Sequence, residues 1–244
     1  IVFKTENNAS ISAFNYVDVS AMESANMVRS ELEGDFAICR TIMLSFKDYK
    51  EYDAKQRIYN YNKTLKTVVA NTDQFMAVWC DWELNNLDVD YNKEHGRESF
   101  TFYKDGDDIK YKREVVDTSD NVSGIYYDIK ANSTEILTEP YFYSYSSKKS
   151  EEILMASVCI PMMDDDRFIG LVGADVELER IHNLTDNISP FEGSSAMMIS
   201  SEGMVFTHSK SDDSHIYKVD SLDLGKNLDF KFSDKLNDGK AFSY

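Results

Sequence analysis

One apolar stripe runs through the start of this chain without interruption. Between Ala9 and Phe46 there is no proline and a single glycine, Gly34. The apolar residues recur at steps of three and four: Ile11, Phe14, Val17, Ala21, Ala25, Val28, Leu32, Phe36, Cys39, Met43 and Phe46. This spacing predicts one α-helix with an apolar face, and at about 1.5 Å per residue the helix would be about 55 Å long. Because one compact lobe cannot cover that length, we expect the helix to run from near Ser10 to near Phe46 and to pack along two lobes.

Composition limits the classes of partner. The chain has 244 residues, of which 42% are hydrophobic, so it can bury a core without disulfide staples. Its three cysteines, Cys39, Cys80 and Cys159, are too widely spaced for a CxxC pair or a disulfide framework. Acidic residues outnumber basic ones by 43 to 26, which gives a formal net charge of −17. That charge opposes binding to phosphates or anionic lipid, so we expect no nucleic-acid partner.

The rest of the chain predicts one more helix and then mainly strands. A helix is expected from Asp53, its N-cap, to about Thr72. The β-prone runs are 75–79, 100–103, 109–116, 152–160 and 167–176. Turn sequences at 104–107 and 164–166 join two pairs of these runs into hairpins, which predicts an antiparallel sheet. A helix from Glu177 to about Asp186 precedes further strand signals from Ala196.

These elements predict an α+β fold with three parts. Residues 1–73 hold the long N-terminal helix and the second helix, 74–186 a first lobe, and 187–244 a partial second lobe. We expect both lobes to contain antiparallel sheets. The second sheet is expected to be incomplete, because the turn 237–240 opens a strand near Ala241 that has no continuation.

Four short motifs follow one another between Phe75 and Ile181. They are 79–88 with Gly96-Arg97, the pair Tyr126-Tyr127, the segment 137–141, and 169–176. In this order and spacing they resemble the extracytoplasmic double Cache (dCache) sensor domain of methyl-accepting chemotaxis receptors and sensor histidine kinases. The resemblance implies a membrane-distal PAS-like ligand-binding lobe followed by a smaller membrane-proximal PAS-like lobe. It also implies that Pro161 closes the strand before the last hairpin.

The resemblance implies a role in signal transduction rather than catalysis. We expect an extracytoplasmic (periplasmic or extracellular) sensor module of a transmembrane receptor for chemotaxis or a two-component system. Membrane segments would flank this sequence, and two copies would form a homodimer through the long helix. The output module could be methyl-accepting, kinase or cyclase.

Asp175 is the first candidate ligand-binding residue. It stands in an otherwise apolar strand, and burying a lone carboxylate costs several kcal/mol unless a donor reaches it. In the family that this chain resembles, the matching aspartate commonly holds a ligand amine. The alternative is that Asp175 caps the helix starting at Glu177.

Aromatic residues complete the predicted site. Trp79, Tyr126, Tyr127 and Tyr141 could enclose a cation or stack on a flat ligand, although they could equally form a plain aromatic core. Strand alternation places Trp79 and Asp81 on one face and Trp82 on the other with Val78 and Cys80. The predicted ligand-binding residues are therefore Trp79, Asp81, Tyr126, Tyr127, Tyr141 and Asp175.

The expected carboxylate clamp is missing. In amino-acid-binding members of the resembled family, a tyrosine and an arginine precede the aromatic pair, and the matching positions here are Ser119 and Gly124. Because Gly124 has no side chain, we expect a small organic ligand that carries an amine, in preference to an α-amino acid. An amino-acid-like ligand and an uncharged or anionic ligand stay open as alternatives. Arg97 could substitute from another strand, but a surface role is expected for it.

Other chemistries have little support in the sequence. Four histidines lie far apart without a metal-ligand spacing, and no P-loop, GxGxxG or Gly-x-Ser-x-Gly motif occurs. We therefore expect no enzyme, no cofactor and no metal, and we interpret the acidic run 164–166 as a solvated turn. Two alternatives remain open: a periplasmic hydrolase, and an adhesin or structural stalk, which a ligand-induced melting shift would distinguish from a sensor.

Overall fold

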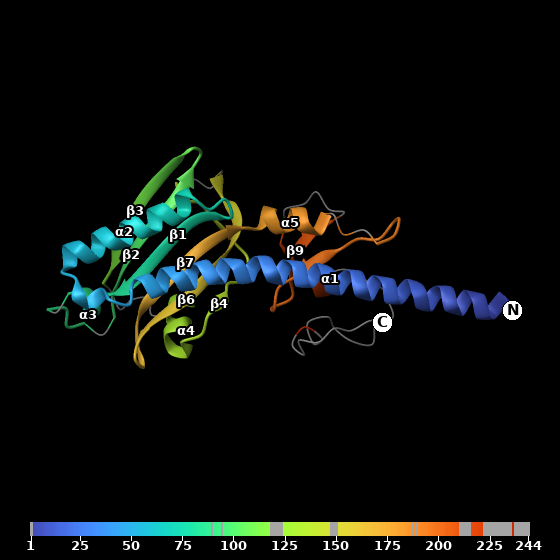
Figure 1. Cartoon of the computed structure of the whole chain (residues 1–244), viewed down its shortest axis with the longest axis horizontal. Helices are drawn as coiled ribbons and strands as arrows, with labels where there is room; N and C mark the ends of the chain where they lie inside the picture. Colours follow the sequence, from blue (N-terminus) through green and yellow to red (C-terminus); the bar gives the residue numbers. More distant parts are fainter. Residues whose placement is uncertain are drawn as a thin grey trace. The chain divides into compact units, whose positions relative to one another are not determined.

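The computed structural model describes residues 2–88, 90–93, 95–117, 124–146, 151–186, 188, 190–209, 216–221 and 236 (Figure 1). The chain divides into two compact units. Unit 1 comprises 1–32, 139–141 and 178–244, and unit 2 comprises 33–138 and 142–177. The boundaries predicted from the sequence, after residues 73 and 186, stay predictions.

The first element is the long helix α1, Val2–Ser45, which Gly34 does not interrupt. This confirms the continuous helix predicted from the sequence. Within unit 2, its side chains Cys39 and Ile42 are buried, together with Phe46 just after the helix. Within unit 1, Val28 is buried, but Ile11 and Phe14 are each 58% exposed. The apolar stripe is thus covered at its end and left open near its start.

The second helix begins with a complete capping box. A single turn of 3-10 helix, η1 (Tyr49–Glu51), leads into α2, Ala54–Ala70. The Asp53 carboxylate accepts from the backbone N–H groups of Lys55 and Gln56 (2.8 and 2.9 Å), and the Gln56 side chain accepts from the Asp53 N–H (3.2 Å). Two unpaired N–H groups of the first turn are satisfied in this way, which explains why the helix starts here.

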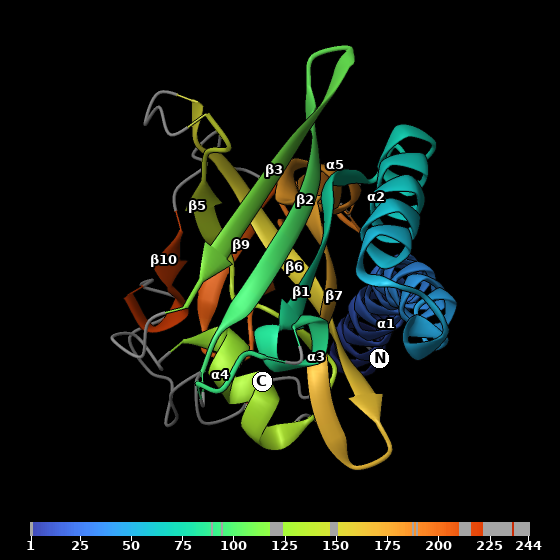
Figure 2. The same ribbon diagram turned by 90° about the vertical axis from the view of Figure 1, so that its left-hand side faces the viewer.

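Unit 2 is built on an antiparallel sheet with the strand order β3-β2-β1-β7-β6-β4, and β5 also pairs with β6 (Figure 2). The strands are β1 Phe75–Glu83, β2 Arg97–Asp105, β3 Asp108–Val116, β4 Ile136–Leu137, β5 Tyr141–Tyr143, β6 Ile153–Asp164 and β7 Arg167–Glu177. Both predicted hairpins, β2–β3 and β6–β7, are confirmed. Two short helices, α3 (Leu84–Leu87) and α4 (Ile125–Asn132), were not predicted.

The two faces of this sheet have different coverings. On one side, here called the helix face, Val78, Cys80 and Trp82 of β1 pack with residues of α1 and α2 in the main core. The Trp82 indole stacks on the Tyr61 ring of α2 at 4.6 Å between centroids. The opposite side, here called the site face, carries Trp79 and Asp81 and is covered in part by α4 (Figure 2). This confirms the predicted split of the two tryptophans.

The prediction that Pro161 closes the strand before the last hairpin was wrong. Pro161 lies inside β6, opposite Leu171 of β7, and the strand continues to Asp164. On the other side of β6, the pairing with β4 extends only as far as Cys159. A proline has no N–H to donate, so it fits a strand at a point where one edge is not used for pairing.

The described part of unit 1 contains a second, smaller sheet. Helix α5 (Leu178–Asp186) precedes β8 (Met197–Ile199), β9 (Met204–His208) and β10 (Tyr217–Lys218), which pair in the order β10-β9-β8, and η4 (Val219–Ser221) follows. The strand predicted from Ala241 and its turn at 237–240 lie outside the described residues. Among the helices that the structure describes, none combines the length and the apolar content needed to cross a membrane.

All three cysteines are buried as free thiols in unit 2. Burial, with a smaller contribution from the Asp35 carboxylate, raises the pKa of Cys39 to about 12. Burial also raises the pKa of Cys80 and of Cys159 well above the usual value. The thiols are therefore protonated at neutral pH.

Replacing Asp53 with alanine removes the capping box of α2. We expect the free energy of unfolding to fall by about 1 kcal/mol, because N-cap substitutions of this kind cost about that much. Urea unfolding followed by circular dichroism measures the change. Asp48→Ala is the matched control, because Asp48 precedes η1 without a side-chain capping bond. Equal losses in the two variants would contradict the assignment of Asp53 as the cap.

Candidate ligand-binding site

The site face is defined by the register of the central strands. In β1, Ala77 lies opposite Asp175 of β7, Trp79 opposite Gly173, and Asp81 opposite Leu171. On the other side of β7, Ser157 of β6 lies opposite Asp175. Residues directly opposite each other on antiparallel strands point to the same face. The register therefore brings Trp79, Asp81, Ser157 and Asp175 to one side of the sheet.

Asp175 is buried and accepts hydrogen bonds from three side chains. The indole Nε1 of Trp79 and the hydroxyl of Ser157 both donate to Oδ1, at 2.9 and 2.6 Å. The hydroxyl of Tyr145, in the loop after β5, donates to Oδ2 at 2.5 Å. These donors stabilise the buried carboxylate, so its burial alone does not require a ligand cation. All three of these donors are neutral groups.

A bare backbone at Gly173 lets Trp79 reach Asp175. A Cβ atom on Gly173 would overlap the six-membered ring of the Trp79 indole. The indole can therefore lie across β7 only because residue 173 has no side chain, and in that position its Nε1 meets Asp175 two residues further along the strand.

Tyrosines surround this end of the site. The ring of Tyr145 stacks on that of Tyr103 from β2, with 4.6 Å between centroids and 10° between planes. Tyr143 contacts Tyr145 edge-on at 5.0 Å. None of these three tyrosines was predicted as a site residue, and neither was Ser157. No motif marks Tyr145, since it lies in a loop whose path the sequence alone does not give.

A second polar cluster lies further along the same face, around Glu83 at the end of β1. The Tyr126 hydroxyl donates to Glu83 Oε1 at 2.7 Å, and Lys130 Nζ lies 2.9 Å from Oε2. Tyr126 and Lys130 are four residues apart on α4, so they reach the carboxylate from the same side of the helix. Burial and the adjacent Glu83 carboxylate raise the pKa of Tyr126, which keeps its hydroxyl protonated as a donor.

Arg97 lies between this cluster and Asp81. Its Nε is 3.6 Å from Asp81 Oδ2, its guanidinium carbon is 4.4 Å from the centre of the Tyr126 ring, and its side chain is 27% exposed. The expected surface role for Arg97 was therefore wrong, because β2 turns this residue onto the site face. Burial raises the pKa of Asp81 above its ordinary value, whereas a hydrogen bond from Ser99 and the positive charge of Arg97 act in the opposite direction.

The predicted site residues are only partly brought together. Trp79 contacts Asp175 directly, while Asp81 and Tyr126 meet through Arg97. Tyr127 packs edge-on against Tyr126 at 5.3 Å and against His95 at 6.0 Å. Tyr141 is the first residue of β5 and is grouped with unit 1, and its role in the site stays a prediction.

The positions expected for a carboxylate clamp hold no clamp in the described chain. Ser119 lies outside the described residues. Gly124 precedes the first turn of α4 with φ 95°, in the left-handed region that favours glycine. An arginine at position 124 would therefore strain the backbone.

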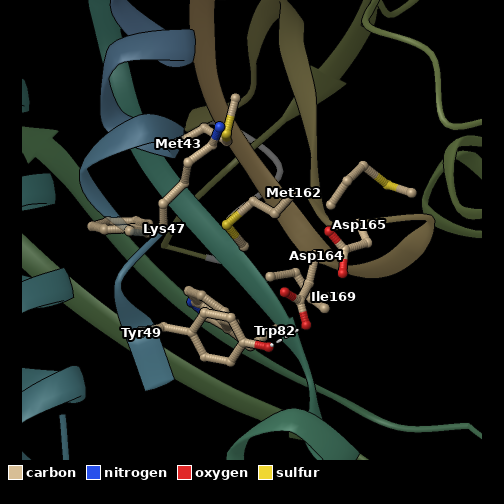
Figure 3. A pocket seen from close by; sticks show the side chains of 10 residues that line it. Met43, Lys47, Tyr49, Trp82, Met162, Asp164, Asp165 and Ile169 are labelled. Carbon is tan, nitrogen blue, oxygen red and sulfur yellow. Dashed lines mark hydrogen bonds between the residues drawn. The ribbon is translucent and has the colours of Figure 1, made fainter. Parts of the chain in front are cut away.

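A cavity of about 210 Å³ lies on the helix face, away from these residues (Figure 3). It is lined by the end of α1 and by the β6–β7 hairpin, and Asp164 stands at its edge. Asp164 accepts a hydrogen bond from the Tyr49 hydroxyl at 3.1 Å and pairs with Lys50 and Arg167, which lower its pKa. Among the described residues, no group of three or more metal-ligating side chains is placed to hold an ion.

Comparison with known families gives one match. The model of the family described as "Methyl-accepting chemotaxis protein-like, first PDC sensor domain" matches residues 55–183. This segment contains the whole of β1, both hairpins and the polar clusters of the site face. No curated protein sequence matches the chain.

Several solved structures are similar in fold. The extracellular domain of the proposed histidine kinase mmHK1S-Z2 has a TM-score of 0.65 and 20% identity over 82% of this chain and 74% of that one. Methyl-accepting chemotaxis protein X has a TM-score of 0.63 and 17% identity over 95% and 83%. The ligand-binding domain of the Campylobacter jejuni chemoreceptor Tlp3, in complex with L-valine, has 0.59 and 14% over 85% and 75%. At these identities the likeness establishes the fold alone.

Replacing Gly173 with alanine tests the contact between Trp79 and Asp175. The new methyl group would displace the indole, so we expect the free energy of unfolding to fall by about 1–3 kcal/mol, as for overpacking elsewhere. Gly34→Ala is the matched control. Gly34 has open space around it in α1, and alanine there should stabilise the helix by about 0.8–1 kcal/mol. Urea unfolding measures both changes, and a neutral Gly173→Ala would contradict the packing described here.

Proposed function

Because the chain belongs to the family of methyl-accepting chemotaxis protein-like first PDC sensor domains, we propose that it is the extracytoplasmic ligand-binding part of a transmembrane signal-transduction receptor. The receptor would be a chemotaxis receptor or a histidine kinase. The strongest support within the molecule is the two-sided strand β1. Its residues Trp79 and Asp81 lie on the site face, and the intervening residues Cys80 and Trp82 pack against the helices of unit 2.

This alternation suggests how a ligand would be sensed. A ligand that binds Trp79 or Asp81 better in one arrangement of β1 shifts the population toward that arrangement. Cys80 and Trp82 would then move against their neighbours in the core, which include Ile42 of α1 and Phe46 just after it. The long helix would carry a small shift of this kind along its axis.

The ligand is proposed to be a small organic molecule that carries an amine and binds on the site face of unit 2. Asp175 offers a carboxylate held in place by neutral donors, and Trp79 and Tyr145 place aromatic rings beside it. Aromatic faces and a carboxylate both attract a cation. The bound L-valine of the Tlp3 domain, which has the same fold, supports a small organic ligand of this general size.

Amine binding should depend on the charge of Asp175. We expect at least one probe from a panel of primary alkylamines and phenethylamine to bind the native chain, measured by isothermal titration calorimetry. Asp175→Asn keeps the shape of the side chain and should weaken that binding at least about tenfold, because a charge-assisted hydrogen bond is lost. Ser157→Ala, which removes a donor but keeps the charge, is the control and should weaken binding less. An unchanged affinity in Asp175→Asn would contradict the assignment.

We also propose a homodimer formed through the start of α1. Ile11, Phe14 and Met22 lie on one side of the helix and are each more than half exposed. A second copy of the same helix offers a matching apolar surface, so pairing of two copies would bury both.

Replacing Phe14 with glutamate should disrupt this dimer. A charge in the apolar contact would have to be desolvated, so we expect the native chain to sediment as a dimer at micromolar concentrations and Phe14→Glu as a monomer. Tyr59→Glu on α2, where the native side chain is 64% exposed, is the control and should leave the association unchanged. A native chain that stays monomeric, or a dimer unaffected by Phe14→Glu, would argue against this interface.

A further inference from the structure

Another cavity of unit 2 lies on the helix face, between the end of α1 and α2, and has a volume of about 490 Å³. Both helices lie on the same side of the sheet (Figure 2), the side opposite to the site face. The end of α1, η1, Tyr52 and one side of α2 line the cavity. Sites for small molecules typically have volumes of about 300–1,000 Å³, so this cavity is large enough to hold one.

The wall that α2 contributes is mostly polar. Its residues Asn60, Lys63, Thr64 and Thr67 follow one another at steps of three and four, so they lie on one side of the helix. A helix side that packs in a core is normally apolar. This polar side therefore faces either water or a ligand with polar groups.

Tyr61 lines the same cavity and carries a polar atom without a partner. The side chain is only 2% exposed, and its ring packs against Trp82 and Phe46, each at 4.6 Å between centroids. Its hydroxyl is buried and has no hydrogen-bond partner among the described residues. Burial raises the pKa of Tyr61, so the hydroxyl stays protonated and can donate. Buried hydroxyl groups are usually paired, so this one lacks an acceptor.

The charge of α2 is opposite to that of the whole chain. The helix contains Lys55, Arg57, Lys63 and Lys66 and no acidic residue, whereas the chain has a net charge of −17. Arg57 is engaged, because it donates to two backbone carbonyl groups of α3. Lys63 lines the cavity and forms no ion pair with the other residues that the structure describes. An anionic group in the cavity would supply that partner.

We propose that this cavity binds an aromatic carboxylate, at a site separate from the one on the site face. The Tyr61 hydroxyl and the Lys63 ammonium group donate to the carboxylate. The rings of Phe46, Tyr49 and Tyr52 pack around the aromatic ring of the ligand. The inference does not depend on the amine site, because no residue is shared between the two.

A panel of probes tests the ligand class on the native chain. Benzoate, phenylacetate and indole-3-acetate are titrated by calorimetry beside cyclohexanecarboxylate, which lacks the aromatic ring, and benzyl alcohol, which lacks the charge. We expect at least one aromatic acid to bind at least about threefold more tightly than either comparison compound. Failure of all three aromatic acids to bind, or equal affinity for benzyl alcohol, would refute the inference.

Variants assign the binding to this cavity. Tyr61→Phe should weaken binding of the aromatic acid at least about tenfold, because a hydrogen bond to a charged group is lost. Lys63→Gln should weaken it about three- to fivefold, since an exposed ion pair contributes less. Lys66→Gln, on the same helix but outside the cavity, is the control and should bind as the native chain does, as should Asp175→Asn. Native affinity in Tyr61→Phe, or loss of binding in Asp175→Asn, would overturn the assignment.

The stability of Tyr61→Phe is a separate check on the unpaired hydroxyl. The variant keeps the ring and its contacts, and the removed hydroxyl has no partner among the described residues. We therefore expect its urea unfolding midpoint to equal or exceed that of the native chain. A clearly lower midpoint would show that the hydroxyl is already paired, and would contradict its role as a donor to the ligand.

Discussion

The alternation of side chains along β1 is the constraint on which the rest of unit 2 depends. Successive residues of a strand point to opposite faces, so one strand can contribute to a core and to a site at once. Val78, Cys80 and Trp82 form part of the core against the helices, while Trp79 and Asp81 face the other way. A slip of one residue in the register would exchange the two sets and place a carboxylate in the core.

The site face carries three carboxylates in one neighbourhood, and each is stabilised differently. Asp175 accepts hydrogen bonds from Trp79, Ser157 and Tyr145, Glu83 pairs with a lysine and a tyrosine, and Asp81 lies near the Arg97 guanidinium and accepts from the Ser99 hydroxyl. Buried carboxylates without such partners would take up protons and lose their charge. Burial raises the pKa of Asp81, and the hydrogen bond from Ser99 and the charge of Arg97 act against that rise. The end of the site face near Asp175 is therefore suited to a cation, whereas positive side chains gather at the end near Glu83.

Local sequence patterns predicted most helices and strands of this chain. The residues of the site were harder to predict, because they depend on which strands pair and in which register. Short stretches of sequence contain the helical period of α1, the N-cap at Asp53 and the two hairpin turns. These features could therefore be recognised without a structure. Ser157 could not. Counting back from the pair Asp164–Arg167 places Ala156 opposite Asp175, but a bulge between Met162 and Met163 shifts the register by one residue. The orientation of Arg97 depends in the same way on which strands become neighbours.

The chemistry of the three cysteines has a practical consequence. Thiolates react with alkylating reagents and thiols scarcely do, so buried thiols with raised pKa values are slow targets. A cysteine introduced at an exposed position, such as Tyr59 of α2, would be modified in preference to the native ones. Fluorophores or spin labels could therefore be attached at chosen points without first removing Cys39, Cys80 or Cys159. The native sequence would then serve directly as the background for spectroscopic measurements of movement.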